Sequence, residues 1–284
     1  MEKAILISIL AFTAIGIAIA LTAIRNDTIQ DYRDSFTNAE EKPLKHIPKK
    51  IFQLIADKKN IDPKFQKNID YIRKLNPEWK YTLMDDVDII EYIRDYYEPE
   101  ILESYLRINP KYGAARADLF RYLLMYREGG VYLDIKSAAT IPLSRMILPD
   151  DEYILAHWAL PTKAIETGII DGEYQQWHII CRPYHPFLYH VIQNVLANIE
   201  KYSPESVGVG KSGVLKVTGP IAYTNAISPI RNKHSHRLVE FDEYIGLVYN
   251  NLSSGFSSQS HIGLFSKPHY SKINEPIILP KIND

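Results

Sequence analysis

The segment from Ala114 to Asp134 constrains the fold of this chain more than any other. Residues 119–126 are apolar almost all round a helix, which predicts a helix that is buried on every side. Gly129-Gly130 ends that helix, and Val131-Tyr132-Leu133 is typical of a short buried strand. A helix followed by a strand in this way predicts an α/β domain with Asp134 at the strand's carboxyl end, where open α/β sheets place ligands.

The rest of the sequence alternates between strand and helix patterns in a similar way. Strands are expected at 47–53, 79–84 and 153–158, and helices at 65–75, 86–97 and 186–202. Asn76-Pro77 should end the first of these helices, because a proline and the residue before it are poorly placed in a helix. Residues 250–268 show neither pattern and are expected to form a loop-rich tail.

Length and composition limit the classes of function. A chain of 284 residues with 46% hydrophobic residues is long enough for one α/β domain with a full core. The net charge of -1 and the absence of a basic run argue against a nucleic-acid partner. Cys181 is the single cysteine, which excludes an intramolecular disulfide and a zinc site built from cysteines.

The N-terminus carries an apolar run from Ala4 to Ile24. As a helix, its roughly 21 residues would be about 31 Å long, which matches the hydrocarbon core of a bilayer. A cleavable signal peptide is the alternative, with Ala18-Ile19-Ala20 as its cleavage site, although its apolar region would be unusually long. We therefore expect a membrane anchor at 1–24, a polar stem at 25–46 and the folded domain at 47–284, with a membrane orientation that the flanking charges do not decide.

Charged residues in buried surroundings are the candidates for chemistry. Asp118 and Arg121 lie three residues apart on the buried helix, so they form either an internal ion pair or a clamp for a bound ligand. Asp134 follows a buried strand, where a carboxylate either binds a divalent cation or caps the next turn. The sequence alone leaves both pairs of interpretations open.

The residues of this region also carry a family resemblance. The runs Ala115 to Tyr122 and Gly129 to Asp134 resemble the sugar-binding region of glycosyltransferase family 32, which includes fungal Golgi α-mannosyltransferases and inositol-phosphoceramide mannosyltransferases. Residues 47–53, the stretch from Asn76 to Asp86, and Thr218-Gly219-Pro220 resemble that family as well. The resemblance implies a GT-A fold, that is, a Rossmann-like mixed sheet flanked by helices, together with a nucleoside-diphosphate donor and retention of the anomeric configuration.

Site residues can be assigned from this resemblance one position at a time. It makes Asp134 the first acid of the Asp-any-Asp motif and, with Lys136, a catalytic residue. The residues expected to bind the donor are Gln53, Arg116, Asp118, Arg121, Tyr122 and Gly130. Gln176 and Trp177 are expected on the acceptor side, because a tryptophan face suits a sugar ring, although a core tryptophan is the alternative.

Lys136 is a departure from the family pattern, because it stands where the second acid belongs. A lysine beside a divalent ion would repel it, so binding of Mn²⁺ or Mg²⁺ is in doubt. One hypothesis is that the ammonium replaces the cation and neutralises the leaving diphosphate. The alternative is a solvated Lys136, with a metal held by Asp134 and a late histidine such as His269.

Together these observations predict a single-pass membrane glycosyltransferase, type II-like and in a Golgi, ER or equivalent secretory membrane. It would move a hexose, with mannose favoured, from a GDP- or UDP-sugar to a glycan or glycolipid. One alternative is a sugar-binding protein that has lost catalysis through Lys136, and another is a glycoside hydrolase that uses Asp118 and Asp134. On the transferase interpretation, alanine at Arg121 or Asp134 should abolish transfer and leave the fold intact.

Overall fold

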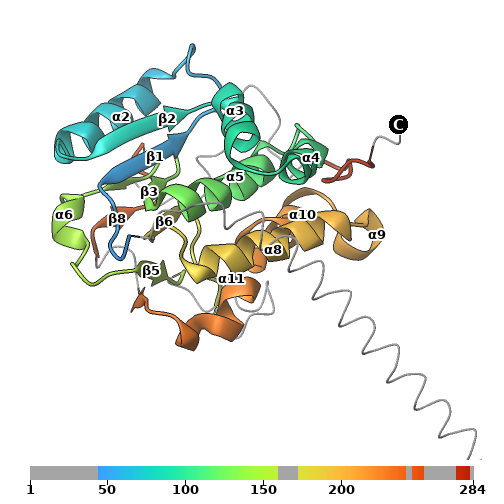
Figure 1. The fold of residues 1–284 in the computed structure, drawn as a ribbon. Coiled ribbons are helices and arrows are strands. Elements are labelled where there is room, and N and C mark those ends of the chain that lie inside the picture. Colours follow the sequence, from blue (N-terminus) through green and yellow to red (C-terminus); the bar gives the residue numbers. More distant parts are fainter. Residues whose placement is uncertain (1–43, 159–171, 241–244, 253–272, 282–284) are drawn as a thin grey trace, which may run out of the picture. The chain divides into compact units, whose positions relative to one another are not determined.

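A six-stranded mixed sheet organises the part of the chain that the computed structural model describes, residues 44–158, 172–240, 245–252 and 273–281 (Figure 1). Its order is β2-β1-β3-β6-β5-β7. The strands are β1 (Lys50–Leu54), β2 (Lys80–Met84), β3 (Gly130–Leu133), β5 (Tyr153–Ala156), β6 (His178–Cys181) and β7 (Arg237–Val239). Strand β1 runs parallel to β2 and β3, β6 is antiparallel to β3 and β5, and β5 is parallel to β7. A small second sheet pairs β4 (Ala138–Ala139) with β8 (Leu247–Val248).

Helices flank this sheet, as Figure 1 shows. They are α2 (Pro63–Leu75), α3 (Asp86–Tyr96), α4 (Pro99–Arg107), α5 (Gly113–Glu128), α6 (Leu143–Met146), α8 (Pro186–Glu200), α9 (Pro204–Val207), α10 (Gly210–Val217), α11 (Pro220–Ile227) and a 3-10 helix, η1 (Ser228–Lys233). The predicted α/β class, with a mixed sheet and flanking helices, is therefore confirmed. The expected strand at 47–53 begins only at Lys50, because its N–H donates to the Pro48 carbonyl at 2.8 Å in a turn that precedes the strand.

Both faces of the sheet are covered because the strand residues alternate between two sets of partners. Ile180 belongs to the same apolar cluster as Ile51 of β1 and Ile72 of α2, which places α2 over one face. The adjacent Cys181 donates from Sγ to the carbonyl of Met125 in α5 at 3.5 Å, which places α5 over the other face. The buried helix predicted from sequence is α5 and the buried strand is β3. Helix α5 packs against the face of the sheet that β3 and β6 form.

Two glycines allow α5 to stop and β3 to start within one residue. Gly129 and Gly130 have φ angles of 60° and 97°, which L side chains rarely adopt. A Cβ on Gly130 would lie 2.5 Å from the carbonyl oxygen of Lys50, so a side chain there would push β3 away from β1. The parallel strands β1 and β3 therefore end at the same edge, and Asp134 follows at that edge.

No helix within the described ranges is long and apolar enough to cross a membrane. The span predicted from Ala4 to Ile24 lies outside these ranges, as do residues 25–43 of the stem expected at 25–46 and most of the tail expected at 250–268.

Candidate active site around Arg121

The centre of the candidate site is the guanidinium of Arg121, which lies between two carboxylates. Its Nη2 is 3.2 Å from Oδ1 of Asp118, and its Nη1 is 3.1 Å from Oδ1 of Asp134. Nη1 also donates to the Gln176 carbonyl at 3.0 Å, and Nε donates to the Ala117 carbonyl at 3.2 Å. Only 7% of the Arg121 side chain is exposed, so these contacts hold the cation in one place.

The surroundings of Arg121 favour its charged form. Its guanidinium carbon lies 4.8 Å from the centre of the Tyr132 ring, within cation–π distance. Burial by itself would lower the pKa of Arg121, but electrostatic contact with Tyr132, Asp134 and Asp118 raises it above its ordinary value. The internal ion pair between Asp118 and Arg121, one of the two interpretations left open by the sequence, is therefore present. Asp134 is a second carboxylate on the same guanidinium.

The Asp118 carboxylate faces protein, with 3% of the residue exposed. Its Oδ1 accepts from Nε2 of Gln176 at 3.1 Å, and its Oδ2 accepts from the Thr218 hydroxyl at 2.9 Å. Burial raises the pKa of Asp118, while Arg121, Gln176 and Thr218 oppose that rise. These contacts make Asp118 a positioning residue for Arg121, and its direct contact with a donor stays a prediction.

Asp134 is the carboxylate that a ligand can reach, since 26% of its side chain is exposed. The Tyr132 hydroxyl donates to Oδ1 at 3.0 Å, and Arg121 binds the same oxygen. Both of these hydrogen bonds reach Oδ1, and among the described residues none is found for Oδ2. The next turn is closed by the Asp134 carbonyl, which accepts from the Ser137 N–H at 2.8 Å, while the hydrogen bonds found for the carboxylate among the described residues come from Arg121 and Tyr132.

The backbone of residues 134–137 is held by hydrogen bonds from four separate segments. The bonds run from Asp134 N to Trp177 O at 2.8 Å, from Gln53 Nε2 to Asp134 O at 3.0 Å, from Asn68 Nδ2 to Ile135 O at 3.0 Å and Ser137 O at 2.9 Å, and from Asn251 N to Lys136 O at 2.8 Å. Every carbonyl of the segment accepts a hydrogen bond. The shape of the segment is therefore determined by strand β1, helix α2, the residue before β6 and the residues after β8.

The Lys136 ammonium lies over an aromatic ring next to this cluster. Its Nζ is 3.8 Å from the centre of the Tyr249 ring. The pKa of Lys136 is lowered to about 8, mainly because the side chain is buried; Asp134 opposes this change and Arg121 adds to it. The Tyr249 backbone also contacts the segment, because its carbonyl accepts from the Ser137 hydroxyl at 2.7 Å.

Four of the predicted donor-binding residues make structural contacts. Gln53 is fully buried, where it links the Tyr81 hydroxyl at 2.8 Å to the Asp134 carbonyl. Arg116 donates from Nε to the Ile108 carbonyl at 2.9 Å, and Tyr122 donates from its hydroxyl to the Thr218 carbonyl at 2.9 Å. Gly130 packs against the backbone of β1. Their roles toward a donor stay predictions.

The two predicted acceptor-side residues differ in position. Gln176 belongs to the cluster through its bonds to Asp118 and Arg121. Trp177 is 3% exposed and donates from Nε1 to Oε1 of Gln175, so its ring is part of the core beside Tyr249. The core alternative thus describes the position of Trp177, and the acceptor role of both residues stays a prediction.

The described residues do not fit a divalent cation. No group of three histidine, cysteine, aspartate or glutamate side chains gathers among them, and His269 lies outside the described ranges. Asp134 is instead in electrostatic contact with two positive groups, Arg121 and Lys136. At about 4 Å and an effective dielectric near 20, each unit of like charge would oppose a bound cation by roughly 4 kcal/mol.

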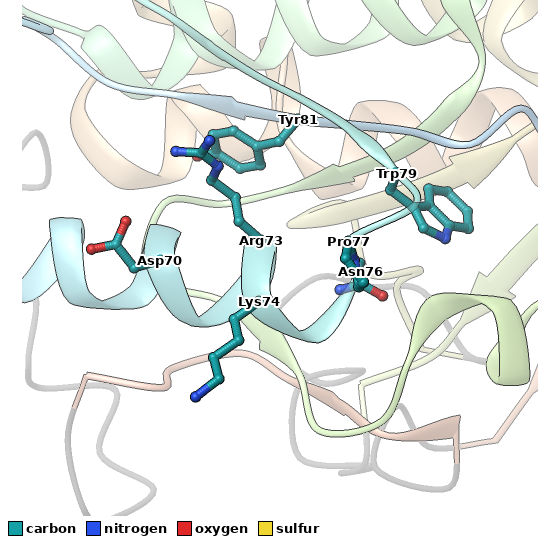
Figure 2. A pocket seen from close by; sticks show the side chains of 7 residues that line it. All are labelled: Asp70, Arg73, Lys74, Asn76, Pro77, Trp79 and Tyr81. Atoms are coloured by element: carbon teal, nitrogen blue, oxygen red, sulfur yellow. The ribbon is translucent and has the colours of Figure 1, made fainter.

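A hollow of about 440 Å³ lies at the start of β2, away from Arg121. Figure 2 shows the side chains that line it, namely Asp70, Arg73, Lys74, Asn76, Pro77, Trp79 and Tyr81. Arg73 extends toward the Tyr81 ring, with its guanidinium carbon 6.0 Å from the ring centre, and Lys74 points the other way in this view. The Tyr81 hydroxyl in the lining of the hollow donates to Gln53, which in turn donates to the Asp134 carbonyl.

Three residues that contact this cluster were not predicted from the sequence, namely Tyr132, Tyr249 and Asn68. Tyr132 lies two residues before Asp134, and a period of two places both side chains on one side of a strand, so this spacing was a usable signal. Asn68 is a polar residue among the buried apolar residues of α2, which is unusual enough to indicate a specific partner. Tyr249 offered no signal, because its contact with Lys136 joins segments more than a hundred residues apart.

Comparisons with known proteins agree with the resemblance inferred from sequence. Residues 62–154 match the family described as glycosyltransferase sugar-binding region containing DXD motif. The chain is 26% identical over 226 residues to the initiation-specific alpha-1,6-mannosyltransferase of Candida albicans, which covers 69% of this chain and 56% of that protein. It is 27% identical over 163 residues to inositol phosphoceramide mannosyltransferase 1 of Schizosaccharomyces pombe, which covers 54% of this chain and 44% of that protein. The chain thus spans about half the length of these relatives.

The fold is similar to that of a solved glycosyltransferase. The PaToxG glycosyltransferase superposes with a TM-score of 0.50 at 19% identity, over 80% of this chain and 82% of that one. The GT-A expectation is therefore supported by the sheet and by this likeness in fold.

Proposed function

This chain carries, over residues 62–154, the sugar-binding region of DXD-type glycosyltransferases, and from that premise we propose that it transfers a hexose from a nucleoside-diphosphate sugar. Mannose is the favoured hexose, because the matched relatives described above are mannosyltransferases. GDP- and UDP-sugars are the candidate donors, and a glycan or glycolipid is the candidate acceptor. A secretory membrane as the location and retention of the anomeric configuration belong to the same proposal.

One observation carries the proposal, namely the contact between Arg121 and Asp134 at the carboxyl edge of β3. The carboxylate is partly exposed, while the guanidinium behind it is buried and bonded. A carboxylate fixed in this way accepts hydrogen bonds from sugar or ribose hydroxyl groups in one orientation. Asp134 is thus the residue that contacts the donor, and Arg121 orients it.

The transfer requires little covalent chemistry from the protein. The bond between the anomeric carbon and the diphosphate oxygen breaks, and its electron pair stays on the diphosphate. The acceptor hydroxyl oxygen bonds to that carbon, and the hydroxyl proton passes to the released diphosphate. Holding donor and acceptor in register and stabilising the leaving charge therefore account for most of the rate.

A glycoside hydrolase is disfavoured by the same geometry. Such an enzyme needs two carboxylates on opposite sides of the bond that breaks. Asp118 and Asp134 instead bind the same guanidinium, and Asp118 is 3% exposed with both oxygens bonded to protein. The remaining alternative is a sugar-binding protein without catalysis, which Lys136 in the place of the second acid makes worth testing.

The experiment incubates the full chain with GDP-mannose, UDP-glucose and related donors, and measures released nucleoside diphosphate with and without acceptor glycans. We expect release from one donor, stimulated by acceptor. In Asp134→Asn release should fall by about 10² or more, because a neutral amide replaces the anionic carboxylate that accepts from the donor hydroxyls. Donor binding without any release would favour the sugar-binding alternative. Equal release by wild type and Asp134→Asn would contradict the site.

A further inference from the structure

Lys136 has a fixed backbone position next to Asp134. Its carbonyl accepts from the Asn251 N–H at 2.8 Å, and the residues on either side of it are both bonded to Asn68 of α2. A lysine on a free loop could turn its side chain away from a site, but the carbonyl bonds of 134–137 restrict this segment to one shape. The position of the Lys136 backbone is therefore a property of the fold.

The side chain of Lys136 also has a defined direction, because its ammonium lies over the Tyr249 ring. The Tyr249 ring lies 3.8 Å from Nζ, and it is held by the bond between its own carbonyl and the Ser137 hydroxyl. A cation on a ring face is worth roughly 0.5–2 kcal/mol. The ammonium is also close enough to Asp134 and Arg121 to interact electrostatically with both, so it belongs to the same site.

We propose that the Lys136 ammonium, held on the Tyr249 ring, is the built-in cation of this site and neutralises the diphosphate as it leaves, in place of a divalent ion. The inference rests on the proposed function, because it assigns a residue to its leaving group. The electron pair of the broken bond goes to a diphosphate oxygen, and Lys136 donates a hydrogen bond to the charge that develops there.

The geometry around Asp134 disfavours the alternative of a bound metal. A divalent ion on the Asp134 carboxylate would be repelled by Arg121 and Lys136, and the described residues gather no set of three histidine, cysteine, aspartate or glutamate side chains that could hold it. An aspartate at position 136 would instead complete an acidic pair on the same fixed backbone. The substitution Lys136→Asp is therefore expected to create a metal requirement that the wild type lacks.

The test measures the thermal unfolding midpoint with GDP and with UDP, each in EDTA and in MnCl₂. In the wild type we expect one nucleotide to raise the midpoint equally in both conditions. Lys136→Arg should keep this shift, Lys136→Met should reduce it in both conditions, and Lys136→Asp should show it only with Mn²⁺. Loss of one charged hydrogen bond corresponds to about a ten- to hundredfold weaker nucleotide affinity for Lys136→Met.

Two results are decisive against the proposal and can be told apart. A wild-type shift that requires Mn²⁺ overturns the role of Lys136 and leaves the proposed function standing. No shift with either nucleotide in any condition overturns the proposed function, and the inference with it. Unfolding midpoints without nucleotide, measured for every variant, show that the variants are folded.

Tyr249 acts on the reaction only through Lys136, so it is a positioning residue with its own test. Tyr249→Phe keeps the ring face, and we expect it to bind nucleotide in EDTA like the wild type. Tyr249→Leu removes the ring and should weaken binding in EDTA by about fivefold, within the range of a cation–π contact. In the Lys136→Met background, Tyr249→Leu should not weaken nucleotide binding any further. If it weakened binding by the full fivefold there, the ring would act by a route other than Lys136.

Discussion

The cluster around Arg121 and the hollow at the start of β2 both gather charged and aromatic side chains, but they differ in how the charges are held. In the cluster, Arg121 is 7% exposed and bonded to two carboxylates. In the hollow, Arg73 and Lys74 are exposed at the last turn of α2, and they form no ion pair among the described residues. Basic side chains at that position already interact favourably with the helix dipole. The two regions thus differ in whether the fold fixes their positive charges.

The largest expected effect comes from Arg121→Ala. This change leaves Asp118 buried without its cation, so the free energy of unfolding should fall by about 3–5 kcal/mol in a urea titration. From sequence alone the fold was expected to stay intact in this variant, but that expectation did not allow for the burial of Asp118. Arg73→Ala in the hollow is the matched control and should change stability by less than about 0.5 kcal/mol.

A second change separates the contribution of Arg121 to stability from its contribution to transfer. Asp118→Asn in the Arg121→Ala background removes the unpaired carboxylate, so stability should recover in part while transfer stays lost. Equal stability of Arg121→Ala and Arg73→Ala would contradict the difference drawn between the two regions.

An intermediate effect is expected from Asp134→Asn. Because its side chain is partly exposed, the unfolding midpoint should change little, but nucleoside diphosphate release should fall by about 10² or more. The matched control is Asp70→Asn at the hollow, which should release product at the wild-type rate. A loss of the same size in Asp70→Asn would move the active site to the hollow.

The smallest expected effect is on the pH dependence of kcat/KM. Lys136 has a pKa lowered to about 8 by burial, so its charge is present below that pH and is lost as the pH rises through it. We expect kcat/KM, which reports the free enzyme, to fall up to about tenfold per pH unit above this value. Lys136→Arg should shift the fall to higher pH, because a guanidinium stays charged. An unchanged profile in Lys136→Arg would assign the titration to another group.

Stability should respond to the same group with the opposite sign. The pKa of Lys136 is lower in the folded chain than its ordinary 10.5, so the unfolded chain binds more protons between these two values. The free energy of unfolding therefore rises with pH across this window as far as Lys136 is concerned. The fixation that prepares Lys136 for a diphosphate thus carries a cost in stability below pH 8.

The sequence by itself determined the α/β class, the buried helix α5, the glycine-led strand β3 and the presence of acidic and basic residues at its end. These are local properties, because helical periodicity, strand alternation and glycine conformations depend on neighbouring residues. The match of residues 62–154 to a sugar-binding region confirms the resemblance that the same residues suggested.

Only the tertiary structure decided which charges meet. Asp118, Arg121 and Asp134 could have formed one ion pair or two, and their shared guanidinium follows from the packing of α5 against β3. The pairing of Lys136 with Tyr249 and the bonds from Asn68 and Asn251 join segments that are distant in the chain. Such contacts depend on the direction in which each element crosses the sheet, and no local pattern in the sequence encodes that direction.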